Sequence, residues 1–317
     1  MTASVLRPNS SFILPPLIGV SAAMTTAKRR LERFAGTTLP ILLIGPTGTG
    51  KEVMARHVHA MSGRRGTLVD VNCGALPRDM VESLLFGHRR GAFTGAVESV
   101  TGLIACANEG TLFLDELTSL PLEGQAKLLR VLENGELKAL GSTVNTSVDF
   151  RLVAAVQDDI LERLESHQFR RDLFHRLEGL IIQLPPLRCR PEDIEPLAIF
   201  FAGQRGQVLH DDVIHMLRCL DWPGNVRQLR SVVERACILA DEHFIGTRHL
   251  NEALDGTIGI ARPAPPEERD RLIQTCNSFG NDISRIATAL GISRATLYRR
   301  LKELGIRLGT RDRESHA

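Results

Sequence analysis

The stretch that decides the fold is Gly45-Pro46-Thr47-Gly48-Thr49-Gly50-Lys51-Glu52. The apolar residues 39–44 before it predict a buried parallel strand, and residues 53–61 after it predict a helix. In this order the elements form a phosphate cradle, in which backbone N–H groups and the helix N-terminus surround phosphate oxygens and Lys51 adds a positive charge. A glycine-rich turn with an incidental lysine is the alternative, and the flanking elements argue against it. All eight residues are therefore predicted to bind nucleotide.

Composition and length describe an ordinary globular chain with a basic end. With 317 residues, two or three domains are expected, and 43% hydrophobic and 24% charged residues are typical of a globular protein. The net charge of +2 indicates no partner, but residues 281–317 hold eight Lys or Arg against four Asp or Glu. This local excess favours a nucleic-acid partner.

Cysteine usage and hydropathy predict a cytoplasmic location. The six cysteines are scattered without metal-ligand spacing, which is typical of reduced thiols in the cytosol. No apolar run approaches the ~20 residues that a membrane-spanning helix needs, so no membrane partner is expected. Residues 1–16 contain a short apolar run broken by Pro15-Pro16, which predicts a flexible lead rather than a signal peptide.

Polar residues follow two further predicted strands. Residues 67–72 end in Asn72, and residues 111–114 are followed by Asp115-Glu116. In open α/β sheets, ligands bind at the carboxyl ends of the strands. Beside a phosphate loop, Asp115 is expected to hold Mg²⁺, and Glu116 to orient and deprotonate the attacking water. A solvated acidic strand end is the alternative.

A second glycine-rich segment reads Gly91-Ala92-Phe93-Thr94-Gly95-Ala96. Two glycines bracket Phe93 and Thr94, and neither flank shows the periodicity of a core element. A mobile loop with an aromatic residue at its tip is therefore predicted. The residues alone leave open a turn whose phenylalanine packs into the core.

The remaining pattern predicts an α/β body followed by helices only. Helices in the body are expected at 21–35, with Ser21 as N-cap, and at 79–86, 123–132 and 161–177, with a loop at 135–146 and a strand at 150–156. The double proline in residues 184–187 ends the body. Further helices are expected at 193–203, 211–220 and 225–240, the last capped by Asn225, before a proline-rich linker at 256–267.

Residues 282–304 fit a helix-turn-helix. Two short helices joined at Gly291 are expected, and their inward faces carry Ile283, Ile286, Ala287 and Leu290 on the first and Leu297, Leu301 and Leu304 on the second. A small helical hairpin with a basic surface is the alternative. Six side chains remain available for a DNA groove or its phosphates, namely Arg294, Thr296, Tyr298, Arg299, Arg300 and Lys302.

From about Leu17 to Ala317 the chain resembles the bacterial enhancer-binding activators of sigma-54 RNA polymerase. The most specific motif is the hexapeptide 91–96, and the phosphate loop of this family ends in Gly-Lys-Glu, which accounts for Glu52. The resemblance implies an AAA+ P-loop NTPase, an α/β fold with a parallel sheet and flanking helices, followed by an α-helical lid and a Fis-like helix-turn-helix. The expected division is 1–16 (lead), 17–186 (ATPase), 187–255 (lid), 256–267 (linker) and 268–317 (DNA-binding domain).

The resemblance also implies roles for individual residues. Phe93 and Thr94, with the rest of Gly91 to Ala96, would contact sigma-54 and promoter DNA, and Asn72 would hold Glu116 and switch with nucleotide state. Residues 169–177 match the arginine-finger helix, and residues 222–229 match the lid motif. The implied catalytic and phosphate-sensing residues are Asp115 (also the metal ligand), Glu116, Asn72, Arg170, Arg176 and Arg227.

The implied function is a transcription activator that binds upstream DNA, assembles a homo-oligomeric ring, by resemblance a hexamer, and uses ATP with Mg²⁺ to remodel the closed polymerase complex. The strand that usually ends in Ala-Thr-Asn here ends in Ala155-Val156-Gln157, so a looser link between phosphate state and arginine helix is expected. Because no sensory domain precedes Leu17, control by a partner protein in trans or by expression level is expected. The alternative is a DNA-binding regulator whose degenerate ATPase domain serves only nucleotide binding or oligomerisation.

Overall fold

The computed structural model describes the backbone of residues 3–6, the ranges 14–240 and 243–257, and positions 283, 286, 287, 294 and 297. The chain divides into two units, Met1–Arg218 with Trp222–Gly259, and Cys219–Asp221 with Ile260–Ala317. Within the described ranges, no helix has the length and apolar character that a bilayer crossing requires. The first unit contains both the phosphate loop and the helical segment that follows the α/β body.

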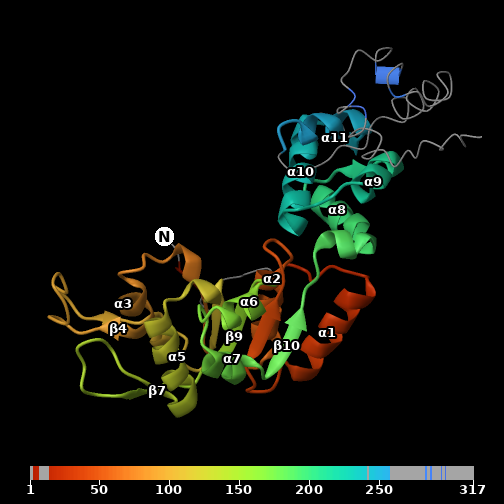
Figure 1. Cartoon of the computed structure of the whole chain (residues 1–317). Coiled ribbons are helices and arrows are strands. Elements are labelled where there is room, and N and C mark those ends of the chain that lie inside the picture. The colour runs from red at the N-terminus through yellow and green to blue at the C-terminus, as the bar shows by residue number, and fades with distance from the viewer. Residues whose placement is uncertain are drawn as a thin grey trace, which may run out of the picture. The chain divides into compact units, whose positions relative to one another are not determined.

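A six-stranded sheet forms the centre of the first unit (Figure 1). Five strands are parallel, and β1 is added antiparallel to β3 at the edge, within the predicted flexible lead. The strands predicted at 39–44, 67–72, 111–114 and 150–156 are confirmed, whereas β1 and β10 were not predicted. In spatial order the strands are β1 (Ala3–Leu6), β3 (Leu68–Asn72), β6 (Thr111–Asp115), β9 (Arg151–Val156), β2 (Ile41–Ile44) and β10 (Leu180–Gln183).

Helices cover both faces of this sheet, which explains why its strands are continuous apolar runs. On one face, residues such as Leu43 and Phe113 pack against α1 (Ala22–Phe34) and α2 (Lys51–Met61). On the other face, residues such as Leu42 and Leu114 pack against the remaining helices of the body. These are α3 (Val81–Phe86), α4 (Leu103–Cys106), α5 (Leu122–Asn134), α6 (Ile160–Glu165) and α7 (Arg171–Leu177).

The prediction of one helix over 161–177 is wrong. The segment forms α6 and α7, and His167 between them has φ 56°, outside the helical range. The cause is a side chain on α5: Gln125, fully buried, accepts a hydrogen bond from the Arg170 backbone N–H at 2.9 Å and donates to the Gln168 carbonyl at 3.3 Å. This distant amide satisfies backbone groups that a continuous helix would have paired locally.

In the described part of the first unit, the body is followed by α8 (Ile194–Gly203), α9 (Asp211–Arg218), α10 (Asn225–Leu239) and α11 (Thr247–Leu254). Two turns of 3₁₀-helix, Leu187–Cys189 and Pro191–Asp193, lead into them. The prediction of helices only is wrong in one detail, because β11 (Val208–Leu209) and β12 (Phe244–Ile245) form a short parallel pair. Trp222, 2% exposed, donates its indole N–H to the Leu217 carbonyl at 2.9 Å and closes the core of this helical segment.

Two hairpin-like insertions lie side by side at the α3 end of the body (Figure 1). The first contains β4 (Gly87–His88) and β5 (Val100–Thr101), and the second, predicted as an irregular loop, contains β7 (Glu136–Leu137) and β8 (Thr146–Ser147). The backbone of Leu140 bridges them, since its N–H donates to the Gly87 carbonyl at 2.9 Å and its carbonyl accepts from the Arg89 N–H at 3.0 Å.

In the second unit, the described positions fit the predicted helix-turn-helix. Residues 283, 286, 287, 294 and 297 are helical; Ile286, Ala287 and Leu297 are buried, whereas Arg294 is exposed. The other five residues predicted to contact DNA, Thr296, Tyr298, Arg299, Arg300 and Lys302, lie outside the described residues.

Truncating Phe113 to alanine tests the core between β6 and helices α1 and α2. Because Phe113 is 1% exposed, we expect the free energy of unfolding to fall by about 3–5 kcal/mol, the usual cost of removing a buried aromatic ring. Leu161→Ala is the matched control; at 64% exposure it should change the free energy by less than about 0.5 kcal/mol. Urea unfolding followed by circular dichroism measures both, and equal losses in the two variants would contradict this account of the core.

Candidate functional site

The phosphate loop has a conformation that requires glycine at two positions. Gly48 and Gly50 have φ angles of +81° and +105°, in the region that residues with a Cβ rarely adopt. At Gly48, a Cβ would also lie only 2.4 Å from the Gly224 carbonyl oxygen. Gly50 directly precedes α2, so the backbone N–H groups of the loop lie beside the positive, N-terminal end of that helix.

Residues of the predicted lid (187–255) donate hydrogen bonds to three successive backbone carbonyl groups of the phosphate loop. Asn225 donates its side-chain N–H to the Thr47 carbonyl at 2.9 Å, the backbone N–H of Arg227 donates to Gly48 at 3.3 Å, and Arg190 donates to Thr49 at 2.8 Å. The predicted N-cap role of Asn225 is wrong. Asn225 is the first residue of α10 and has φ 53°, and its side-chain oxygen accepts from the Leu187 N–H at 2.8 Å. The side chain therefore connects the loop to residues 187–193, the two 3₁₀ turns before α8, which we call the hinge.

Lys51 projects from the first turn of α2 and is only 8% exposed. Its ammonium group donates to the carbonyl oxygens of Gly45 and Pro46 at 2.6 and 2.9 Å. Burial lowers the pKa of Lys51, and the negative charges of Asp115, Asp158 and Glu116 oppose this shift. A buried ammonium facing acceptors within its own loop suits a polyanionic ligand that can replace them.

The two carboxylates lie at the carboxyl end of β6, as predicted. Burial raises the pKa of Asp115, which is opposed by a 2.9 Å hydrogen bond from the Glu116 backbone N–H and by the charge of Lys51. Glu116 has φ 51°, and its Oε2 lies so close to Gly74 that a Cβ there would be 2.2 Å away. The end of β6 therefore presents both carboxylates to one cavity, which Asn72 at the end of the neighbouring β3 also lines.

The structure brings Asn72 close to Glu116 without a bond between them. The Asn72 side-chain oxygen accepts from the N–H groups of Gly74 and Ala75 at 2.8 and 3.1 Å, and this caps the 3₁₀ turn Cys73–Ala75. The same Gly74 contacts the Glu116 carboxylate. The expectation that Asn72 holds Glu116 therefore stays a prediction, with Gly74 between the two side chains in this state.

Glu52 has a partner on its own helix. Its carboxylate accepts from the Arg56 guanidinium at 2.5 Å, and the same guanidinium lies 3.4 Å from Asp70 on β3. Burial raises the pKa of Asp70 to about 6; Glu52 and Asp115 add to this shift and Arg56 opposes it. Glu52 is thus part of a charge cluster on α2 and β3.

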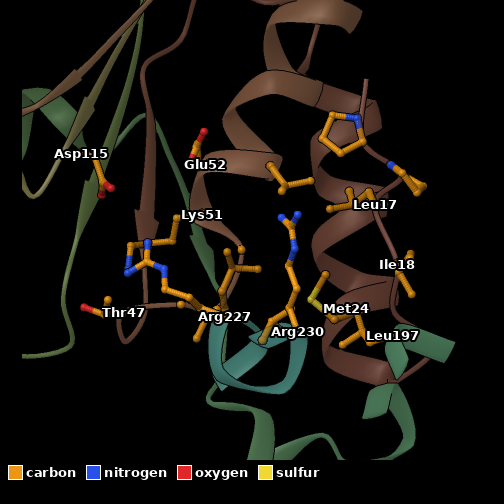
Figure 2. A pocket seen from close by; sticks show the side chains of 18 of the residues that line it. Leu17, Ile18, Met24, Thr47, Lys51, Glu52, Asp115, Leu197, Arg227 and Arg230 are labelled. Atoms are coloured by element: carbon orange, nitrogen blue, oxygen red, sulfur yellow. The ribbon is translucent and has the colours of Figure 1, made fainter. Parts of the chain in front are cut away.

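The phosphate loop and the strand ends at Asn72 and Asp115 line a cavity of about 320 Å³ that has two chemically different halves (Figure 2). Thr47, Lys51, Asp115 and Arg227 lie around one half, which is polar. The other half is apolar and was missed by sequence reasoning, because its residues come from segments that carry no motif. They are Pro15, Pro16, Leu17, Ile18 and Met24 before and on α1, and Leu197, Phe200 and Phe201 on α8.

The predicted arginine fingers are not among the residues that line this cavity. Arg170 forms an ion pair with Asp172 at 2.6 Å, and this hydrogen bond lowers the pKa of Asp172. Arg176 donates to the Leu132 carbonyl at 2.8 Å. Arg170 is the N-cap of α7, and Arg176 lies in the last turn of that helix.

The hexapeptide 91–96 forms a turn, closed by a hydrogen bond from the Ala96 N–H to the Phe93 carbonyl at 3.0 Å. Phe93 does not pack into the core: it is 46% exposed, and its ring centroid lies 5.1 Å from that of His88. Ala92 packs against the second insertion at Gly141, where a Cβ would be 2.8 Å from the Ala92 Cβ. The loop therefore presents its aromatic residue at the surface, as predicted.

The residues present fit a nucleoside triphosphate. Glycine N–H groups, Lys51 and the start of α2 match a chain of phosphates, and the apolar half matches a flat heterocyclic base. The Asp115 carboxylate beside Lys51 is a suitable ligand for Mg²⁺, which keeps several waters and binds through one or two carboxylates plus phosphate oxygens. Among the described residues, no group of three or more His, Cys, Asp or Glu forms a separate metal site.

Three family models match successive parts of the chain. They are the sigma-54 interaction domain over residues 17–183, the AAA+ ATPase lid domain over 188–263, and the bacterial regulatory protein, Fis family, over 264–304. These matches confirm the predicted fold class, an AAA+ α/β domain with a lid and a helix-turn-helix.

Relatives and solved structures agree with this assignment. The DNA-binding transcriptional activator HyfR of Escherichia coli is 39% identical over 318 residues, covering 92% of this chain and 48% of its own length. The anaerobic nitric oxide reductase transcription regulator NorR of Salmonella agona is 40% identical over 293 residues, covering 86% and 57%. The chain thus spans about half the length of the curated relatives it matches.

Among solved structures, NtrX from Brucella abortus in complex with ATP is similar, with a TM-score of 0.70 and 33% identity over 92% of this chain and 70% of that one. A RuvB mutant from Thermotoga maritima, with a TM-score of 0.56 and 16% identity over 90% of this chain and 88% of that one, shares the fold.

Replacing Asp70 with asparagine tests the charge cluster beside the site. Because the pKa of Asp70 is raised to about 6, its charged form destabilises the fold above that pH, and the cost fades as pH falls from 6 toward 4. We expect Asp70→Asn to raise the free energy of unfolding by about 1–3 kcal/mol at pH 7.5, with a shrinking gain below pH 6. Urea unfolding at several pH values measures this.

Asp149→Asn is the control, since the Asp149 side chain is 78% exposed and pairs only at the surface. It should alter the free energy by less than about 0.5 kcal/mol at either pH. A gain from Asp70→Asn that is equally large at pH 4.5 and 7.5 would contradict the buried-carboxylate explanation.

Proposed function

This chain belongs to the sigma-54 interaction domain family, and we propose that it is a transcription activator that hydrolyses ATP to remodel the closed complex of sigma-54 RNA polymerase. One observation carries the proposal: a complete phosphate site and a surface loop with the hexapeptide 91–96 occur in the same folded body. A nucleotide-binding module alone would leave the exposed aromatic loop without a use. The Fis-type segment supports binding of DNA.

The proposed chemistry uses groups at the carboxyl ends of β2 and β6. The loop N–H groups and Lys51 bind the β- and γ-phosphates, and Glu116 orients and deprotonates the attacking water. A Mg²⁺ ion held through Asp115 would neutralise charge on the phosphate oxygens. Arg227, which enters the cavity from the lid, links the phosphates to the lid position.

Hydrolysis by this site is proposed to depend on assembly. Arg170 and Arg176 do not line the cavity of their own chain, and in this proposal they act on the nucleotide of a neighbouring subunit. A cation supplied across an interface stabilises the charge of the transition state, which supports a homo-oligomeric ring, by family a hexamer, as the active form. The Arg170–Asp172 pair is surface-exposed and therefore weak enough to be exchanged for a phosphate contact.

Phe93 is proposed to be the residue through which the ring acts on the polymerase complex. Ala92 on Gly141 and the Leu140 backbone bridge fix the loop against the second insertion, so a shift of either insertion moves the other. In this proposal, nucleotide binding releases the loop, and Phe93 and Thr94 contact sigma-54 and promoter DNA in the cytoplasm. The second unit keeps the ring at upstream DNA through Arg294 and its neighbours.

An open-complex assay with purified sigma-54 polymerase, a supercoiled sigma-54 promoter and ATP tests the proposal. We expect wild type to open the promoter, Phe93→Ala to hydrolyse ATP without opening it, and Glu116→Ala to bind ATP without hydrolysis. Val97→Ala is the matched loop control, since Val97 is 73% exposed beside the hexapeptide, and it should retain activity. Equal activity in wild type, Phe93→Ala and Glu116→Ala would overturn the proposal; a wild type that binds but never hydrolyses ATP would favour the degenerate-ATPase alternative.

Val156 and Gln157 allow a second test, because both line the cavity at the end of β9. Val156 offers no hydroxyl there, and the amide of Gln157 lies one methylene further out than an asparagine amide. We expect Val156→Thr with Gln157→Asn to raise kcat for ATP by roughly three- to tenfold, at most about 1.4 kcal/mol of barrier. A steady-state ATPase assay measures it, and an unchanged kcat would mean that these positions do not limit hydrolysis.

A further inference from the structure

A buried arginine at the hinge joins the two halves of the nucleotide cavity. Arg190 lies between the two 3₁₀ turns that lead into the lid, is 1% exposed, and lines the cavity. One terminal nitrogen donates to the carbonyl of Thr49 in the phosphate loop at 2.8 Å. The other lies 3.6 Å from the carboxylate of Asp193, which is fully buried.

Asp193 continues this connection to the apolar half. Its Oδ1 accepts from the backbone N–H groups of Val20 and Ser21 at 2.6 and 2.8 Å, and its Oδ2 accepts from the Ser21 hydroxyl at 2.8 Å. Ser21 is the N-cap of α1, as predicted from the sequence. Leu17 and Ile18, immediately before these residues, form part of the apolar wall, so Asp193 holds the segment that carries the wall.

Stability alone does not explain a buried ion pair at this position. Removing two charges from water costs free energy that the pair recovers only with good geometry, and apolar replacements of such pairs are often neutral or stabilising. Here the pair is not fully satisfied, because the Arg190 Nε is buried and has no hydrogen-bond partner. What the pair does is connect three segments far apart in sequence, at Thr49, at 190–193 and at 20–21.

We propose that Arg190 and Asp193 are positioning residues that hold the apolar half and the polar half of the cavity in one fixed relative geometry, the first for the base and the second for the phosphates. The base and the triphosphate of one ligand then bind to a preformed site, and the free energy of base binding adds to that of phosphate binding. Without the pair, the wall at Leu17 and Ile18 shifts relative to the phosphate loop. This inference rests on the proposed nucleotide binding of the cavity.

Calorimetric titration of the full chain with two ligands tests it: ATP, which uses both halves, and inorganic tripolyphosphate, which uses only the phosphate half. The variant Arg190→Met with Asp193→Asn removes both charges with little change of shape. We expect the ratio of the two dissociation constants, tripolyphosphate over ATP, to fall by roughly ten- to hundredfold, the size of one or two charge-assisted hydrogen bonds. Tripolyphosphate binding should weaken much less than ATP binding, because Asn225 and Arg227 still hold the loop carbonyls of Thr47 and Gly48.

Arg188→Met is the matched control, because Arg188 is an exposed arginine two residues away, and it should leave the ratio unchanged. If the double variant does not fold by circular dichroism, Arg190→Lys replaces it. The lysine side chain is shorter and lacks the two separate terminal nitrogens that reach Thr49 and Asp193, so one of the two contacts weakens and the ratio should fall there too. A ratio equal to that of wild type, or equal weakening of both ligands, would overturn the inference. If wild type binds tripolyphosphate and ATP equally well, the inference is also overturned. If wild type binds neither ligand, the proposed function itself is overturned.

Discussion

Three successive carbonyl groups of the phosphate loop point toward the lid, and the rest of the site depends on this arrangement. Thr47, Gly48 and Thr49 each give their carbonyl oxygen to a donor from residues 190–227. With these carbonyl oxygens paired to the lid, the backbone N–H groups of the loop are free to bind phosphate, which carbonyl oxygens cannot do. The lid therefore takes part in building the loop conformation as well as covering the nucleotide.

Burial and neighbouring charges together set the electrostatics of the cavity. Lys51 and Asp115 are both shifted toward their neutral forms by burial, and each keeps its charge partly through the other. In this poorly solvated space the opposite charges of Lys51 and Asp115 attract one another more strongly than they would in water. A triphosphate with its metal ion carries negative charge that suits Lys51 and positive charge that suits Asp115.

The cavity and Phe93 lie in different parts of the same body. The cavity forms between the carboxyl ends of the strands and the lid, whereas Phe93 lies on an insertion after α3. The two insertions are fixed to one another by backbone hydrogen bonds and by close packing at Gly141, so they have few independent conformations. Rigid packing of this kind converts small displacements at one end into discrete movements at the other.

Local motifs were determined by the sequence itself. The phosphate loop, the strand ends at Asn72 and Asp115 and the cap at Ser21 follow from glycine conformation, strand patterning and short-range hydrogen bonds, all within a few residues. The tertiary structure alone decided the break that Gln125 imposes before α7, the bridging role of Asn225, the apolar wall at Leu17 and Ile18, and the Arg190–Asp193 connection. Each of these depends on a polar or apolar partner at least 38 positions away in the chain, for example Asn225 with Leu187. Sequence patterns report local conformational preference, and the pairing of distant groups is settled only when the burial of the core brings them together.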